Sequence, residues 1–173
     1  EVYHSFDDMA SRHEIEYEFF EPLEPLIADL DDEKLEIIAF NLLSNAFKFT
    51  PFAGVITLRL ELINEDIIIS VEDSGPGIDE AEQEQIFDRF YQSSHSSTKV
   101  GTGIGLTLAR EYARLHNGSL KVESGKYGGS RFQLTVPHLN LPNTAWKDSY
   151  SLNSSIAPLR MPVEADSSYE DTN

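Results

Sequence analysis

The chain has no cysteine among its 173 residues, which excludes disulfide bonds, thiolate zinc sites and cysteine nucleophiles. This absence also fits a reducing compartment. No apolar run reaches the roughly 18 residues of a membrane-spanning helix. The first residues, EVYHSFDDMA, lack the basic segment of a secretion signal. We therefore expect a soluble segment without an export signal.

Basic residues are also scarce, since 13 lysines and arginines stand against 30 aspartates and glutamates, for a net charge of −17. Nucleic acids and anionic membrane surfaces bind basic patches, so this charge argues against both as partners. The acidity is uneven. Residues 1–36 hold 13 acidic and 2 basic side chains, residues 37–138 hold 12 and 9, and residues 139–173 hold 5 and 2. The middle of the chain is therefore close to neutral and compatible with a phosphate ligand.

One folded domain is expected, because 40% apolar residues with 10% aromatics can fill a core in a chain of this length. Residues 139–173 contain prolines, serines and single apolar residues without a period. We therefore predict a domain over 1–138, followed over 139–173 by a disordered, Pro/Ser-rich acidic tail or interdomain linker.

The periodicity of apolar residues predicts both strands and helices. Ile15, Tyr17 and Phe19 alternate with glutamates, as in a strand with one face in water. Asp31 is placed to cap a helix with a 3.6-residue apolar period that stops before Pro51. The expected strands cover 15–19, 55–63, 67–71, 120–123 and 131–136, and the expected helices cover 31–50, a stretch from about 79 onward and 104–116. These elements predict an α/β two-layer sandwich.

Three polar residues form a stripe on the first long helix. Asn41, Asn45 and Lys48 stand at i, i+4 and i+7, roughly 120° from the apolar face at ~100° per residue. Two carboxamides one turn apart offer oxygen ligands to Mg²⁺, which keeps waters and phosphate oxygens around it. The lysine adds a charge suited to phosphate. Taken alone, the same pattern also fits a solvated helix edge.

An acidic residue stands where the strand over 67–71 ends, in the segment Asp73-Ser74-Gly75-Pro76-Gly77. A carboxylate at this place can accept a hydrogen bond from an exocyclic amine such as that of adenine. Glycines let the following turn approach a flat ligand closely. An ordinary turn with a capping aspartate is the alternative for this segment on its own.

A glycine-rich segment, Gly101-Thr102-Gly103-Ile104-Gly105-Leu106, opens the helix expected over 104–116. Unpaired N–H groups at such a helix start suit phosphate. The spacing differs from the Rossmann and P-loop patterns. The polar residues 93–98 predict a mobile lid, with Phe87 and Phe90 as apolar anchors at its hinge.

Five segments, in this order, closely resemble the successive sequence boxes of the ATP-binding catalytic domain of bacterial sensor histidine kinases. They are NLLSNAFKFTP at 41–51, DSGPGI at 73–78, IFDRFYQ at 86–92, GTGIGL at 101–106 and GGSRF at 128–132. The resemblance covers about residues 1–138. It implies the Bergerat (GHKL) fold, shared with gyrase, MutL and heat-shock chaperone ATPases, in which a mixed, mainly antiparallel sheet packs on about three helices beside a mobile ATP lid.

The resemblance implies a role for each matching residue. Asn45 would bind Mg²⁺, Asp73 would accept from the adenine amine, and Arg89 would lie near the γ-phosphate. Phe49 stands where the family often has tyrosine, and Gln92 where it often has a second arginine. The implied catalytic residues are Asn45, Lys48 and Arg89, and the implied nucleotide-binding residues are Asn41, Asn45, Lys48, Phe49, Asp73, Gly75, Gly77, Ile78, Phe90, Gly101, Thr102, Gly103, Ile104, Gly105, Leu106 and Ser130. The bases Lys48, Arg89, Lys99, Arg110 and Arg114 fall in or near the segments assigned to phosphate.

By the same resemblance, the domain would bind ATP with Mg²⁺ and donate the γ-phosphoryl group to a histidine on a separate dimerisation domain of the same parent protein. A response-regulator receiver domain, in the same chain or in a separate one, would be the next partner. We expect the fragment to be monomeric and cytoplasmic, with the parent anchored in the inner membrane. The phosphoacceptor histidine is expected to be missing, since His13 lies in a strand-like context and His4, His95, His116 and His138 have no motif around them.

Two other functions stay open at this point. One is a degenerate nucleotide-binding or interaction module, which the Gln92 departure leaves in view. The other is an ATPase of the same superfamily. Hydrolysis needs a general base one turn before the Mg²⁺ asparagine, and Asn41 at that position takes no proton at neutral pH, so this function is disfavoured.

Overall fold

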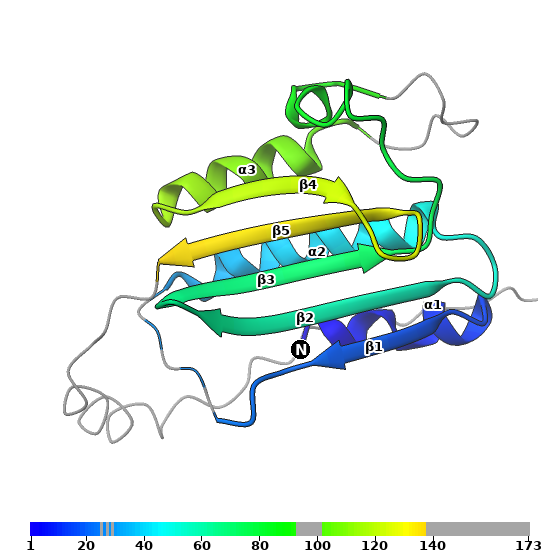
Figure 1. Cartoon of the computed structure of the whole chain (residues 1–173), viewed down its shortest axis with the longest axis horizontal. Coiled ribbons are helices and arrows are strands. Elements are labelled where there is room, and N and C mark those ends of the chain that lie inside the picture. The colour runs from blue at the N-terminus through cyan, green and yellow to red at the C-terminus, as the bar shows by residue number, and fades with distance from the viewer. Residues whose placement is uncertain (25, 27, 29, 93–101, 138–173) are drawn as a thin grey trace, which may run out of the picture. The chain divides into compact units, whose positions relative to one another are not determined.

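A computed structural model of the chain describes residues 1–24, 26, 28, 30–92 and 102–137 (Figure 1). The expected lid at 93–98, Lys99, Gly101 and the tail over 139–173 lie outside the described residues. So do His95, His138 and the predicted domain boundary. These expectations stay predictions.

A five-stranded sheet forms one layer, in the order β1-β2-β3-β5-β4. β1 (Glu16–Phe20) pairs in parallel with β2 (Val55–Ile63), whereas β3 (Asp66–Asp73), β4 (Ser119–Ser124) and β5 (Ser130–Pro137) pair antiparallel with their neighbours. The predicted hairpin is confirmed, with Asn64 and Glu65 in left-handed backbone at its turn. The mixed, mainly antiparallel sheet agrees with the expected fold class.

Helices form the second layer. They comprise η1 (Tyr3–Phe6), α1 (Asp7–Arg12), α2 (Asp32–Phe49) and α3 (Gly105–Leu115), with η2 (Gln85–Phe87) as a single 3-10 turn. In Figure 1, α2 passes behind β3 and β5. Ile38, Leu42 and Leu43 of α2 are fully buried in the same apolar cluster as Val71 of β3 and Leu134 of β5. The two-layer sandwich is therefore confirmed.

The ends of α2 and α3 follow the signals in the sequence. The Asp31 carboxylate accepts a hydrogen bond from the Lys34 N–H at 3.1 Å and caps α2. Asn117, with a φ of 55°, ends α3 in left-handed backbone, and the Gly118 N–H bonds back to the Ala113 carbonyl.

A histidine without a sequence motif links these two helices. His116 Nδ1 lies 2.8 Å from the Tyr112 carbonyl, and Nε2 accepts the Asp31 N–H at 3.2 Å. This pair of bonds requires the neutral imidazole with its proton on Nδ1. His116 thus ties the last turn of α3 to the first residue before α2.

The helix predicted from Asp79 onward is wrong. Residues 80–84 form turns and only Gln85–Phe87 reach a 3-10 turn. The segment holds four acidic residues between Asp79 and Glu84, and Ala81 is its only apolar side chain, so no apolar face draws it onto the sheet. The described residues form three α-helices, as expected, but α1 takes the place of this one.

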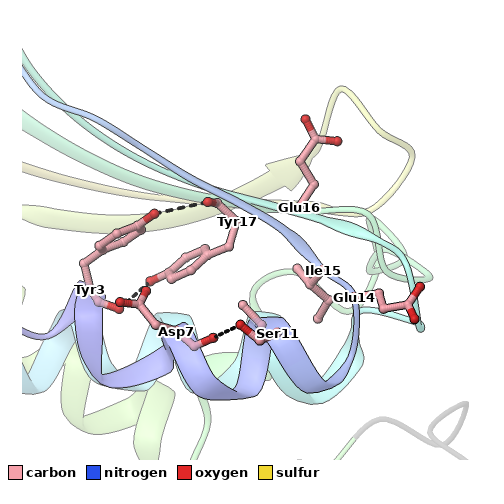
Figure 2. A pocket seen from close by; sticks show the side chains of 8 residues that line it. Tyr3, Asp7, Ser11, Glu14, Ile15, Glu16 and Tyr17 are labelled. Atoms are coloured by element: carbon pink, nitrogen blue, oxygen red, sulfur yellow. Dashed lines mark hydrogen bonds between the residues drawn. The ribbon is translucent and has the colours of Figure 1, made fainter.

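The N-terminal helix α1 was not predicted, because it has fewer than two turns. Phe6 and Ala10, four residues apart, are its buried contacts. The Phe6 ring stacks on Phe47 of α2 at 5.0 Å between centroids. A hollow of about 490 Å³ lies between α1 and β1, and none of the described candidate site residues lines it (Figure 2).

Two tyrosines close one end of this hollow. The rings of Tyr3 and Tyr17 stack at 4.2 Å, and each hydroxyl donates to the other residue's carbonyl, at 3.1 and 3.2 Å (Figure 2). Burial raises the pKa of Tyr17, so its hydroxyl keeps its proton and remains a donor. The pair fixes the start of the chain against β1.

Within the described residues, no helix has the length and apolarity needed to cross a membrane.

We predict that Phe6→Ala lowers the free energy of unfolding by about 3–5 kcal/mol, because it leaves a cavity between α1 and α2. Met9→Ala on the same helix, at an exposed position, should cost less than about 1 kcal/mol. Urea unfolding followed by circular dichroism measures both. Equal effects of the two substitutions would show that α1 is not part of the cooperative core.

Candidate functional site

The centre of the candidate site is Asp73, at the end of β3 on the face that the helices cover. Its side chain is only 3% exposed. Oδ1 accepts two backbone hydrogen bonds, from Gly75 at 2.7 Å and from Ser130 at 3.3 Å. Oδ2 makes no hydrogen bond to any residue that the structure describes. One carboxylate oxygen is thus held by the protein, and the other is left for a donor on a ligand.

Burial raises the pKa of Asp73, and the two backbone hydrogen bonds only partly oppose this effect. The net direction is upward, so the folded protein holds this carboxylate at a cost. Keeping a charged acceptor in such surroundings is typical of a functional site.

Glycine at 129 makes the contact around Asp73 possible. A Cβ at this position would overlap the Asp73 carbonyl and carboxylate and the Gly75 nitrogen. Gly75 lies between the Asp73 carboxylate and the Phe49 carbonyl, which are 2.8 and 2.9 Å from where its Cβ would be. Gly129 was missing from the predicted site residues, although the box at 128–132 contains it. Its role depends on a contact between segments 54 residues apart, which sequence spacing alone does not reveal.

The predicted stripe on α2 faces the start of α3. Asn41 and Asn45 are half-buried and Lys48 is exposed. Asn41 Nδ2 donates to the Ile37 carbonyl at 2.8 Å, and a Cβ at Gly105 would overlap Asn41 Oδ1. The glycine therefore lets the carboxamide come close to the first residue of α3.

Lys48 and Phe49 lie at the last turn of α2. The ammonium stands 4.5 Å from the centre of the Phe49 ring. Partial loss of water around the ammonium lowers the pKa of Lys48. Because Phe49 has no hydroxyl, the ring offers a cation and a flat ligand its face only.

The segment before residue 93 is held against α3. Phe87 is buried, and its carbonyl accepts from the Thr107 hydroxyl at 2.9 Å. The Phe90 N–H donates to the Gly103 carbonyl at 2.9 Å. The prediction that Phe87 is an apolar anchor is confirmed. The same prediction for Phe90 is wrong, because its ring is 71% exposed and only its backbone is held.

Two arginines assigned near phosphate have other partners. Arg110 pairs with Glu84 at 2.9 Å and stacks over the Phe87 ring at 4.8 Å. Arg114 pairs with Glu111 at 2.6 Å on its own helix. Arg110 therefore links α3 to the segment before it, whereas the Arg114 pair lies within α3. That these two bases lie near phosphate stays a prediction.

Of the remaining predicted residues, Gly101 is outside the described part of the chain. Ser130 is buried and gives its N–H to Asp73, while Ile78 and Leu106 pack against the core. Gly77 and Gly103 have positive φ. Arg89, Thr102 and Ile104 are exposed. The structure thus places the fourth box beside Asn41 of α2, the third box against α3, and the fifth box against Asp73 of the second box.

No group of three acidic, histidine or cysteine residues that could hold a metal occurs within the described ranges. A cation at this site would therefore depend on carboxamide oxygens, on water and on the ligand's own oxygens. The half-buried Asn45 fits this type of Mg²⁺ site, because magnesium retains several waters and phosphate oxygens.

Residues 30–140 match the family described as histidine kinase-, DNA gyrase B-, and HSP90-like ATPase. The chain belongs to this ATPase family. The predicted resemblance is confirmed.

Sensor histidine kinase TmoS of Ectopseudomonas mendocina is 42% identical over 136 residues, which are 77% of this chain and 14% of TmoS. The chain therefore spans about a seventh of the length of this curated relative.

Solved structures of histidine kinases share the fold. Full-length ShkA in complex with AMPPNP aligns with a TM-score of 0.71 at 26% identity, covering 81% of this chain and 29% of ShkA. ThkA in complex with the response regulator protein TrrA aligns with a TM-score of 0.68 at 27% identity, covering 80% of this chain and 38% of that one. The chain thus has the GHKL fold of histidine kinase catalytic domains.

We predict that Asp73→Asn leaves the free energy of unfolding at neutral pH unchanged or higher. The raised pKa of Asp73 means that ionising this carboxylate costs stability, and the cost is full above the folded-state pKa. The advantage of the variant should shrink as the pH falls through that pKa towards the unfolded value. Denaturant titrations of both proteins between pH 7 and pH 3 test this, and a large loss of stability at neutral pH would contradict it.

We predict that Gly105→Ala lowers nucleotide affinity about tenfold by displacing the Asn41 carboxamide. Isothermal titration with ATP measures this effect in Gly105→Ala, in Asn41→Ala and in the double variant. If Gly105 acts through Asn41, the double variant should bind no more weakly than Asn41→Ala. Additive losses would instead give Gly105 a separate role.

Proposed function

We propose that this domain binds ATP with Mg²⁺ and transfers the γ-phosphoryl group to a histidine on a separate dimerisation domain in two-component signalling. The observation that carries the proposal is the Asp73 carboxylate, buried at the end of β3 with Oδ2 left to an incoming donor. The exocyclic amine of adenine is such a donor. The relation to TmoS and the AMPPNP bound to ShkA support the same assignment.

In the proposed complex, the base lies between Asp73, the 75–77 turn and the Phe49 ring, and the phosphates extend along the α2 stripe. Asn45 would hold Mg²⁺ through its carboxamide oxygen, with Asn41 beside it. When bound, the cation would neutralise charge on the phosphates. Lys48 and Arg89 add positive charge near the transferring group.

The transfer depends mainly on the orientation of the imidazole and the γ-phosphoryl group, and little on covalent participation by this domain. A neutral imidazole nitrogen on the partner forms a bond to the γ-phosphorus while the bond from that phosphorus to the β–γ bridging oxygen breaks. ADP leaves with the electron pair. Positioning in line and neutralisation of charge carry most of such a reaction. The Asn41 carboxamide cannot act as a general base toward water. Hydrolysis is therefore the less favoured alternative.

The proposed partners follow from this reaction. The acceptor is the dimerisation domain of the same parent protein, and a receiver domain then takes the phosphoryl group, as the complex of ThkA with TrrA suggests by analogy. We also propose that the domain works in the cytoplasm as part of a parent anchored in the inner membrane. His13 is not proposed as an acceptor, because it stands at the C-terminal end of the six-residue helix α1 and not within a long helix.

The test combines ATP labelled in the γ-phosphate with TmoS from which the region matching this chain has been removed. We expect acid-labile, base-stable label on the truncated TmoS when this chain is present, and none on this chain alone. Asn45→Ala should reduce the transfer rate at least about 100-fold while still binding adenosine nucleotides. Ser44→Ala, exposed on the adjacent position of α2, is the matched control and should transfer normally.

Each other result identifies an alternative. Release of inorganic phosphate without labelled protein would indicate an ATPase. Nucleotide binding with neither product would indicate a binding module. Label on His13 would overturn the view that the acceptor lies elsewhere.

A further inference from the structure

Two large apolar side chains lie exposed on α2, directly beside the stripe of Asn41, Asn45 and Lys48. Ile37 is 38% exposed and Phe40 is 51% exposed. The Ile37 carbonyl accepts from the Asn41 carboxamide at 2.8 Å, so this apolar surface adjoins a residue of the candidate site. Neither side chain belongs to the buried core cluster, although Phe40 contacts Phe6 of that cluster.

Phe40 also contacts the N-terminal segment that leads into α1. The Phe40 ring meets Phe6 at 5.4 Å between centroids. Met9 follows Phe6 by three residues, one turn along the same segment, and is 43% exposed. Met9, Ile37 and Phe40 together are named the α1–α2 patch. Clustered exposed apolar residues at a rim of polar groups are typical of a protein contact surface.

The exposed face of α2 changes its chemistry along its length. Residues four apart are neighbours on a helix surface, which gives two adjacent rows. The rows are Glu33, Ile37, Asn41 and Asn45, and Glu36, Phe40, Ser44 and Lys48. From the start of the helix to its end, the surface therefore passes from carboxylates to apolar side chains, then to carboxamides and an ammonium group.

We propose that the α1–α2 patch is the docking surface for the amphipathic helix that carries the phosphoacceptor histidine. This inference rests on the proposed function, which places the γ-phosphate at the α2 stripe. A histidine that reaches the stripe brings the neighbouring turns of its own helix over Ile37 and Phe40. That helix should present apolar side chains to the patch and a basic residue to Glu33 and Glu36 beyond it.

The charge of the chain favours this occupant over a second copy of the same domain. Residues 1–36, which include α1 and the start of α2, hold 13 acidic and 2 basic side chains. Two such surfaces would repel each other, whereas a helix with basic residues would be attracted. Apolar side chains in the centre would supply most of the affinity and the carboxylates would set the orientation.

The experiment measures phosphotransfer to the truncated TmoS over a range of acceptor concentrations. Phe40→Ser and Ile37→Ser should each raise the acceptor concentration at half-maximal rate about tenfold, while the dissociation constant for ATP changes less than about twofold. Glu36→Lys should raise the acceptor concentration at half-maximal rate several-fold at low salt and by a smaller factor at high salt. Leu115→Ser, at an exposed apolar position in the last turn of α3, is the control and should change neither value.

The outcomes separate this inference from the function on which it rests. If the unmodified chain transfers no phosphate to the acceptor, the proposed function and the docking surface fall together. If the unmodified chain transfers phosphate, and both patch variants reach half-maximal rate at the same acceptor concentration as the unmodified chain, only the docking surface is overturned. Loss of ATP binding in both variants would also overturn it. So would a change confined to self-association of the chain, measured by size-exclusion chromatography.

Discussion

The arrangement of the site depends on one buried carboxylate oxygen that two separate loops share. Asp73 Oδ1 accepts the N–H of Gly75, just after β3, and the N–H of Ser130, at the start of β5. The β3 exit is also tied to β2, since Ser74 N–H donates to the Val55 carbonyl and the Val55 N–H donates to the Ser74 hydroxyl. The end of β3 and the beginnings of β2 and β5 are therefore held together at this point. A low-polarity environment strengthens these bonds and raises the cost of the charge. Glycine at 75 and 129 lets the backbone approach the carboxylate, because a Cβ at either position would overlap it.

Much of the fold could be predicted because its signals are local. The α2 cap at Asp31, the two-residue turn at Asn64 and Glu65, and the end of α3 at Asn117 each depend on a few consecutive residues. The stripe on α2 was also predictable, because helix geometry alone places its members on one face. Asp73 could be singled out by its place directly after an apolar strand.

The expectations that failed depend on contacts distant in sequence. The segment after Asp79 has helix-forming residues but no apolar face, and its contacts with α3 through Phe87 and Glu84 hold it as turns instead. The short helix α1 is stabilised by the contact of Phe6 with Phe47, which stands forty-one positions later in the sequence. Three other features likewise depend on packing, which residue spacing in a single sequence does not reveal. They are the approach of Gly105 to Asn41, the overlap avoided at Gly129 and the exposed ring of Phe90.

The bond between His116 and the Asp31 N–H gives the helical layer a fixed corner. It joins the end of α3 to the beginning of α2, while Asn41 and Gly105 meet about 16 Å away along α3, at 1.5 Å per residue. With the end of α3 bonded to the start of α2 at His116, a displacement of α3 would be largest at Gly105. There it would alter the approach of α3 to the Asn41 carboxamide and hence to the polar stripe.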